Sequence, residues 1–184
     1  MNEVLEAIRN RRSTRKLEST SIEDEKIRAI LTAAQWAPSF MNLQPWKFIL
    51  VRESDTKEQL VKALTMPFLQ IVYRGPLPYE NLTKAPIIIV TCVDPNRDRL
   101  HYVEDGACAT QNMALAAHSL GLGSYWIGVF NTFVEDEVKK ILEIPKGYRV
   151  ISLMPIGVPA ESPEKERKNL DNMLYYDKFG QGTP

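Results

Sequence analysis

Two short stretches hold most of the side chains that could do chemistry. The first lies between Pro38 and Pro45 and carries Ser39, Asn42 and Gln44, whose hydroxyl and amide groups donate and accept hydrogen bonds without charge. Proline lacks an N–H and biases the preceding residue away from helical angles, so this loop should stand apart from its flanking elements. It suits the hydrogen-bonding edge of a flat, polar, uncharged heterocycle. The alternative is a stiff connector whose amides only satisfy the backbone.

The second stretch is cationic. Residues 9–16 hold five Arg or Lys side chains, with Ser13 and Thr14 between them. Clustered cations with interleaved hydroxyls can hold a phosphate through charge-assisted and bidentate hydrogen bonds. The alternative is a solvated basic face.

No other pattern in the sequence points to catalysis. It contains no GxGxxG loop after a strand, no Ser/His/Asp set, no nucleophilic cysteine in a basic setting and no paired carboxylates. Its two histidines lie far apart, and with only two cysteines no metal-ligand cluster is visible. If the chain is an enzyme, we therefore expect a cofactor to supply the reactivity.

Composition narrows the class of protein. The length of 184 residues fits a single domain, 1–184, with a full core. Because 23 basic residues balance 23 acidic ones, bulk attraction to nucleic acid or to an acidic membrane is not expected. Cys92 and Cys108 lie in apolar surroundings, which favours reduced thiols over a disulfide. The apolar runs are short and the N-terminus lacks the pattern of a signal peptide, so we expect a cytoplasmic protein.

Apolar spacing predicts the elements that position these stretches. We expect helices around residues 4–8, over about 23–36 (capped by Thr20 or Ser21), and over about 56–64, 102–120 and 135–142. We expect strands over 46–51, 87–93, 124–129 and 148–158, the third breaking at Gly128. Residues 66–84 follow no clean period and are interpreted as a possible lid over a pocket.

The C-terminal segment, residues 163–184, is charged at first and then apolar and aromatic. Such a tail has to bury itself on something, and in a small protein that could be a partner subunit.

Four motifs, in order along nearly the whole chain, resemble those of the nitroreductase family of FMN flavoproteins. They are Arg11-Arg12-Ser13-Thr14-Arg15, the Pro38-to-Trp46 loop, Gly121-Leu122-Gly123 with Trp126-Ile127-Gly128, and Gly157 with Lys165-x-Arg167. The resemblance implies an α+β sandwich with a mainly antiparallel central sheet flanked by helices. It also implies a homodimer that exchanges its C-terminal extensions and holds FMN at the interface.

The resemblance also implies which residues contact FMN. The phosphate and ribityl chain would be held by Arg11, Arg12, Ser13, Lys165 and Arg167. Arg15 would lie by the pyrimidine end, where Gln70 could also bond. The other subunit would supply Pro38, Ser39, Phe40 and Asn42. Backbone N–H groups near Ile127, Gly128 and Val129 would face N5 and O4 of the flavin.

The activity that the resemblance implies is hydride transfer from NADH or NADPH, through flavin N5, to a nitroaromatic, quinone or similar small-molecule acceptor. One face serving both substrates in turn would give ping-pong kinetics, and no catalytic side chain is needed if water supplies protons. Phe40 and Met41 stand where the family more often has small residues, which leaves the acceptor open. The alternatives are a member specialised for one metabolite, such as a dehalogenase or dehydrogenase, a non-catalytic flavin-binding dimer, and a basic docking patch for an acidic partner.

Overall fold

The computed structural model describes residues 2–65, 79–164 and 166–181. Its helices are α1 (Glu3–Asn10), α2 (Asp24–Gln35), α3 (Ser54–Leu64), α5 (Tyr102–Ser119) and α6 (Val134–Ile141). Its strands are β1 (Leu17–Glu18), β2 (Trp46–Val51), β3 (Ile87–Val93), β4 (Gly123–Ser124), β5 (Ile127–Gly128) and β6 (Arg149–Pro159). The short 3-10 turns are η1 (Phe40–Asn42), η2 (Glu80–Lys84) and η3 (Leu170–Asn172).

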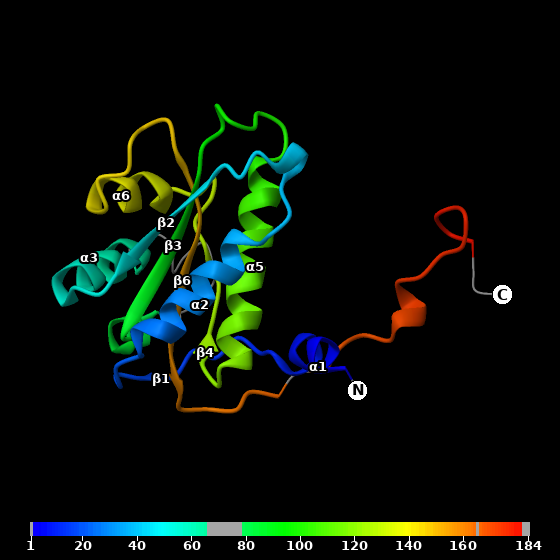
Figure 1. Ribbon diagram of the computed structural model, residues 1–184, viewed down its shortest axis with the longest axis horizontal. Coiled ribbons are helices and arrows are strands. Elements are labelled where there is room, and N and C mark those ends of the chain that lie inside the picture. Colours follow the sequence, from blue (N-terminus) through cyan, green and yellow to red (C-terminus); the bar gives the residue numbers. More distant parts are fainter. Residues whose placement is uncertain (1, 66–78, 165, 182–184) are drawn as a thin grey trace.

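A single antiparallel sheet forms the centre of the molecule (Figure 1). The middle strand β3 pairs with β2 on one side and with the long strand β6 on the other. The far edge of β6 is lined by β1, β4 and β5, each of which pairs antiparallel with a different part of it. This is the α+β sandwich with a mainly antiparallel sheet that the resemblance implied.

The alternation of side chains along β3 builds the core on both faces of the sheet. All seven residues of the strand are buried. Ile87, Ile89 and Val93 pack with α2 and α5 on one face, while Ile88 and Val90 pack with α3 and α6 on the other. Because successive side chains of a strand point to opposite faces, a continuous apolar run such as β3 must be covered twice.

Helix α5 packs closely against the sheet because a glycine faces it. A Cβ atom at Gly106 would lie 2.6 Å from Ile151 Cγ1 and 2.8 Å from Val93 Cγ1, closer than carbon atoms can approach. One turn later, the buried Thr110 hydroxyl hydrogen-bonds to the hydroxyls of Thr91 and Ser152 on the sheet. The helix that spans the molecule is therefore held in one register.

Both ends of the chain expose apolar side chains. None of the residues of α1 is buried, although Val4, Leu5 and Ile8 are apolar. The tail after Ser162 leads away from the body (Figure 1), and it exposes apolar and aromatic side chains that include Tyr175, Tyr176 and Phe179. Within one copy of the chain these side chains are not covered. Their predicted burial against another surface therefore stays a prediction.

The predicted strands 46–51 and 87–93 are confirmed to the residue. The predicted cap of the second helix is wrong, because α2 begins at Asp24 and has Glu23 at its N-cap without a side-chain hydrogen bond. The strand predicted over 124–129 is two short strands that break at Tyr125-Trp126, whereas Gly128 pairs with Ser152. Of the predicted lid, residues 66–78 lie outside the described residues, and the remainder forms η2, with Leu82 buried.

Candidate functional site

Cationic side chains from both ends of the chain line one pocket of about 430 Å³. Arg11, Arg12 and Arg15 come from the segment after α1, and Arg167 comes from the start of the tail. The other residues that line it are Ser13, Lys16, Asn81, Glu161 and Pro163. The pocket thus gathers five cations against one carboxylate.

This arrangement leaves donors that an anion would satisfy. The Nε atoms of Arg11 and Arg12 are buried and have no hydrogen-bond partner among the described residues. Burial lowers the pKa of Arg11, and the like charges of Arg167 and Arg12 lower it further. Since a buried donor without a partner is costly and clustered like charges repel, a phosphate group here would relieve both costs.

Backbone contacts fix the cationic segment onto the sheet. Ser13 forms a parallel bridge with Ser124, and the Thr14 N–H donates to the Ser124 carbonyl at 2.9 Å. The carboxylate of Glu161 accepts hydrogen bonds from the N–H groups of Arg15 (2.9 Å) and Lys16 (3.1 Å). The Glu161 side chain is therefore an anchor that ties the residues just after β6 to the cationic segment, a role that the sequence pattern did not reveal.

The Arg15 guanidinium lies 6.0 Å from the centre of the Tyr125 ring. Tyr125 is buried, and its hydroxyl has no hydrogen-bond partner within the described parts of the chain. Three residues further on, Gly128 pairs with Ser152 on the edge of the sheet, between the buried residues Ile127 and Val129. The segment predicted to face the flavin ring, residues 127–129, therefore begins two residues after the ring that Arg15 approaches.

The loop between Pro38 and Pro45 lies elsewhere. Pro38, Ser39 and Phe40 line a separate pocket of about 260 Å³ with His101 and Asp105, at the N-terminal end of α5. Arg11 and Arg12 directly follow α1, which lies by the C-terminal end of α5 (Figure 1), and Arg12 lines a pocket together with His118 near that end. Since an 18-residue helix is about 27 Å long, one copy of the chain does not bring the two groups together.

The loop itself is a tight turn with an unusual backbone. Met41, Asn42 and Gln44 all have positive φ angles, of 46°, 58° and 48°. The Gln44 N–H donates to Ser39 Oγ at 3.0 Å, and its side-chain amide donates to Asn42 Oδ1 at 3.0 Å. Some of the polar groups therefore form hydrogen bonds within the loop, as the alternative of a stiff connector predicted.

Two of the predicted contacts, Gln70 and Lys165, lie outside the described residues. His118, near the end of α5, lines a pocket of about 410 Å³ that shares Arg12 with the cationic pocket. Burial lowers the pKa of His118, and the nearby charges of Arg11 and Arg12 lower it further. This keeps the imidazole neutral near neutral pH.

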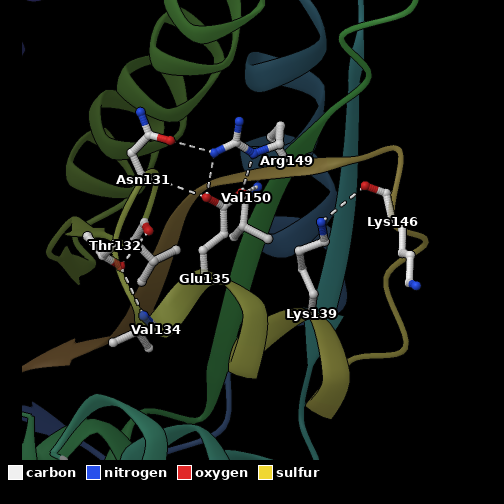
Figure 2. Close-up of polar contacts among 9 residues, drawn as sticks. Asn131, Thr132, Val134, Glu135, Lys139, Lys146, Arg149 and Val150 are labelled. Atoms are coloured by element: carbon white, nitrogen blue, oxygen red, sulfur yellow. Dashed lines mark hydrogen bonds and ion pairs between the residues drawn. The ribbon is translucent and has the colours of Figure 1, made fainter.

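A partly buried ion pair, between Glu135 and Arg149, fixes the loop that follows β5 (Figure 2). The Arg149 guanidinium donates to both oxygens of Glu135, at 2.7 and 2.8 Å, and also to Asn131 Oδ1. Glu135 in turn accepts the N–H groups of Asn131 and Val150. Burial acts to raise the pKa of Glu135, but these hydrogen bonds outweigh it and lower the pKa. The pair joins β6 to α6 and, through Asn131, to the loop that follows β5.

In the parts of the chain that the structure covers, no set of three or more His, Cys, Asp or Glu residues is arranged to hold a metal ion. Within the same residues, no helix has the length and hydropathy needed to cross a bilayer.

Comparisons with known proteins give the context for this geometry. The model of the "Nitroreductase family" matches residues 8–158. A protein of Methanothermobacter thermautotrophicus, provisionally named an NADH dehydrogenase/NAD(P)H nitroreductase, is 37% identical over 167 residues, which cover 88% of this chain and 80% of that protein.

Two solved structures share the fold. An FMN-dependent nitroreductase of Clostridium difficile superposes with a TM-score of 0.80 and 28% identity, covering 95% of this chain and 99% of that one. A provisionally named nitroreductase of Desulfovibrio desulfuricans, solved in complex with FMN, superposes with a TM-score of 0.77 and 29% identity over 97% and 99% of the two chains.

Proposed function

The chain belongs to the nitroreductase family, and on that premise we propose that it is an FMN-dependent oxidoreductase. It takes electrons from NADH or NADPH and passes them to a small-molecule acceptor such as a nitroaromatic or a quinone. The observation that carries the proposal is the pocket in which Arg11, Arg12 and Arg167 meet, where two buried guanidinium Nε atoms have no hydrogen-bond partner among the described residues. The similarity to a protein solved with FMN and to relatives named for NAD(P)H supports the same choice of cofactor and donor.

In this proposal the phosphate of FMN binds among Arg11, Arg12 and Arg167, with Lys165 as a further cation. Guanidinium groups match phosphate oxygens with pairs of parallel N–H donors, which a single ammonium does not. The Ser13 hydroxyl would bond the ribityl chain, since it lines the same pocket. The same donors would also hold a free phosphate dianion. Selectivity for FMN over phosphate must therefore come from contacts with the ribityl chain and the flavin ring.

Bound FMN would supply the two-electron chemistry that this chain's side chains lack. The role of the protein is to bind, orient and tune it. In this proposal Arg15 lies by the pyrimidine end of the ring, where a cation would favour the negative charge of the reduced form. The contact between the Arg15 guanidinium and the buried Tyr125 ring restricts the positions that the guanidinium can take. The backbone at Ile127, Gly128 and Val129 would offer N–H groups to N5 and O4.

We propose that a second copy of the chain completes the site with Pro38, Ser39, Phe40 and Asn42. This follows from the distance along α5 that separates these residues from the cationic pocket in one copy. The exposed apolar side chains of α1 and of the tail provide surface for such an assembly. The tail also contributes Arg167 to the pocket, so covering the tail and binding the phosphate would be linked.

The test is the visible spectrum of the purified protein, followed by anaerobic addition of NADH or NADPH and then of a panel of nitroaromatics and quinones. The proposal predicts a flavin spectrum that one nicotinamide bleaches and that an acceptor restores. Bleaching without turnover of any acceptor would favour the member specialised for one metabolite. A flavin that neither nicotinamide bleaches would favour the non-catalytic dimer. A colourless protein that binds no FMN would contradict the proposal.

A further inference from the structure

The turn that follows β5 continues directly from the backbone that is proposed to face the flavin ring. Its first residue, Val129, is buried, and the Val129 carbonyl accepts both the Thr132 N–H at 3.1 Å and the Thr132 hydroxyl at 2.6 Å. Between these two residues, Asn131 has a φ angle of 55°, in the left-handed region that residues other than glycine rarely adopt. Such a conformation persists only where its surroundings fix it.

The ion pair between α6 and β6 fixes both the backbone and the side chain of Asn131 (Figure 2). The Asn131 N–H donates to Glu135 Oε2 at 2.9 Å, and Asn131 Oδ1 accepts a hydrogen bond from Arg149 Nη2 at 2.8 Å. Arg149 Nη2 also donates to Glu135 Oε2 at 2.8 Å, so the three residues form one connected network. The Arg149 guanidinium lies over the Phe130 ring, 4.5 Å from its centre, and packs against the turn there.

The same carboxylate holds β6 where that strand runs alongside β5. Glu135 Oε1 accepts hydrogen bonds from Arg149 Nε at 2.7 Å and from the Val150 N–H at 3.0 Å. The register between β3 and β6 shifts here, with Val150 and Ser152 on the two sides of the irregularity. Ser152 is also the residue that pairs with Gly128 of β5. Glu135 therefore holds β6 close to the partner of Gly128 and holds the turn beyond Gly128 as well.

This arrangement differs from an ordinary surface ion pair. Glu135 is 5% exposed, and each of its two oxygens accepts two hydrogen bonds, which fills the four lone-pair positions of a carboxylate. Two of the four donors are backbone N–H groups, from Asn131 in the turn and from Val150 in β6. The carboxylate is therefore a cross-link between the two segments that flank the backbone of residues 128 and 129.

We propose that Asn131, Glu135 and Arg149 position the backbone of residues 128 and 129 so that its N–H groups meet the flavin ring. The inference rests on the proposed function, which assigns those N–H groups to N5 and O4. The three are positioning residues, because they act on the ring only through the turn. N–H donors favour the electron-rich reduced ring only while they point at it, so loosening the network should make bound flavin harder to reduce.

The test compares the wild type with two mild variants and a matched control. Arg149→Lys keeps a cation beside Glu135 but removes the planar guanidinium that binds Glu135 and Asn131 together. Asn131→Gly removes the side-chain oxygen and keeps the left-handed backbone without strain. Glu137→Gln is the control, since Glu137 lies on the same helix and forms a surface ion pair with Lys140.

Three measurements separate the possible roles of the network. In the protein freed of flavin, amide hydrogen exchange over residues 127–132 measures how firmly the turn is held. In the protein with FMN bound, the midpoint potential and the visible spectrum of the flavin report the contacts of the ring. The ratio of FMN affinity to riboflavin affinity reports the phosphate pocket, which is lined by other residues.

We expect exchange over residues 127–132 to be about tenfold faster in Arg149→Lys and Asn131→Gly than in the wild type. The equilibrium for reduction of the bound flavin should be about tenfold less favourable, which corresponds to about 30 mV for a two-electron couple. The ratio of FMN to riboflavin affinity should keep its wild-type value. Glu137→Gln should match the wild type in every measurement.

A wild-type flavin potential and spectrum in both network variants would overturn the proposal even if their Tm fell, because a purely structural ion pair would lower stability alone. A reduced ratio of FMN to riboflavin affinity would also contradict it, since the network would then act on the phosphate pocket. Failure of the proposed function would look different. The wild type would then bind no FMN, which would overturn both proposals, whereas the exchange measurement would still show whether the network holds the turn.

Discussion

Arg11 and Arg167 come from opposite ends of the chain and line one pocket, where burial and then the charge of Arg167 lower the pKa of Arg11. The proximity of two like charges needs a compensating anion, and the proposed FMN phosphate is that anion. This relationship gives the most specific expectation for cofactor binding.

Arg11→Ala and Arg167→Ala should each weaken FMN binding by about 10- to 100-fold, because each removes charge-assisted hydrogen bonds to the phosphate. Riboflavin, which lacks the phosphate, should bind to both variants about as well as to the wild type. Fluorescence titration of the apoprotein measures both ligands, with the exposed Arg97→Ala as the control. Equal losses for FMN and riboflavin would show that the substitutions disturb the fold instead of a phosphate site.

The Glu135–Arg149 pair should contribute to stability. Replacing Glu135 with Gln, or Arg149 with Met, leaves the other partner partly buried without its ion pair and should cost about 2–4 kcal/mol in the free energy of unfolding. Urea titration followed by circular dichroism measures this. The exposed pair Lys140–Glu137 provides a matched control, and Glu137→Gln should unfold like the wild type. Identical stability of all the variants would contradict this assignment.

The same pair predicts how stability depends on pH. The folded-state pKa of Glu135 lies below its ordinary value of 4.5, so its stabilisation is complete above that value and is lost as the pH falls through the folded pKa. The difference in unfolding free energy between the wild type and Glu135→Gln should therefore shrink as the pH falls from 5 to 3. A difference that stays constant over this range would mean that the pKa of Glu135 is the same in the folded and unfolded protein, which would contradict this prediction.

Gly106→Ala should destabilise the protein by about 1–3 kcal/mol, although alanine favours helices over glycine. The added Cβ atom would lie 2.6 Å from Ile151 Cγ1, so α5 would have to move off the sheet. Thermal unfolding measures the effect. Gly147→Ala is the control, since the nearest heavy atom to its Cβ would be 3.7 Å away. A stabilised Gly106→Ala variant would show that α5 packs less closely than described.

The sequence alone predicted the strands β2 and β3 to the residue because their apolar runs are continuous and end at a clear break in the pattern. It predicted one strand over 124–129 where the chain forms β4 and β5. Both short strands pair with β6 in the same register, and the pairing is interrupted at Tyr125 and Trp126, which no local pattern indicates. The helix α2 was predicted close to its observed bounds, but its cap was not, because Thr20 and Ser21 lie before Glu23, the residue at the N-cap position.

The site was predictable in its residue types but not in its assembly. The density of cations in residues 9–16 indicated an anion-binding site. That this segment and Arg167 line the same pocket depends on the fold, and the sequence indicated it only through the family resemblance. The roles of Glu161 and Glu135 had no sequence signal, because a carboxylate that holds distant backbone N–H groups looks like any surface acid. The turn from Ser39 to Gln44 was recognised for its polarity, while the hydrogen bond from its Phe40 N–H to Asp105 of α5 was not.

Each flavin site is proposed to combine the cationic pocket of one copy with the turn from Ser39 to Gln44 of another. Mixing two variants tests it directly. One copy carries Arg11→Ala with Arg167→Ala, and the other carries Phe40→Ala with Asn42→Gly, which keeps the left-handed backbone of that position. Each variant alone should bind FMN weakly.

After the two variants exchange subunits, a mixed dimer should contain one site built entirely from unaltered residues. Bound FMN and nicotinamide-dependent flavin bleaching should then recover to about a quarter of the wild-type level at random exchange. If the pocket and the turn belonged to the same copy, every site would carry a defect. Confirmed subunit exchange without any recovery of FMN binding would contradict the account.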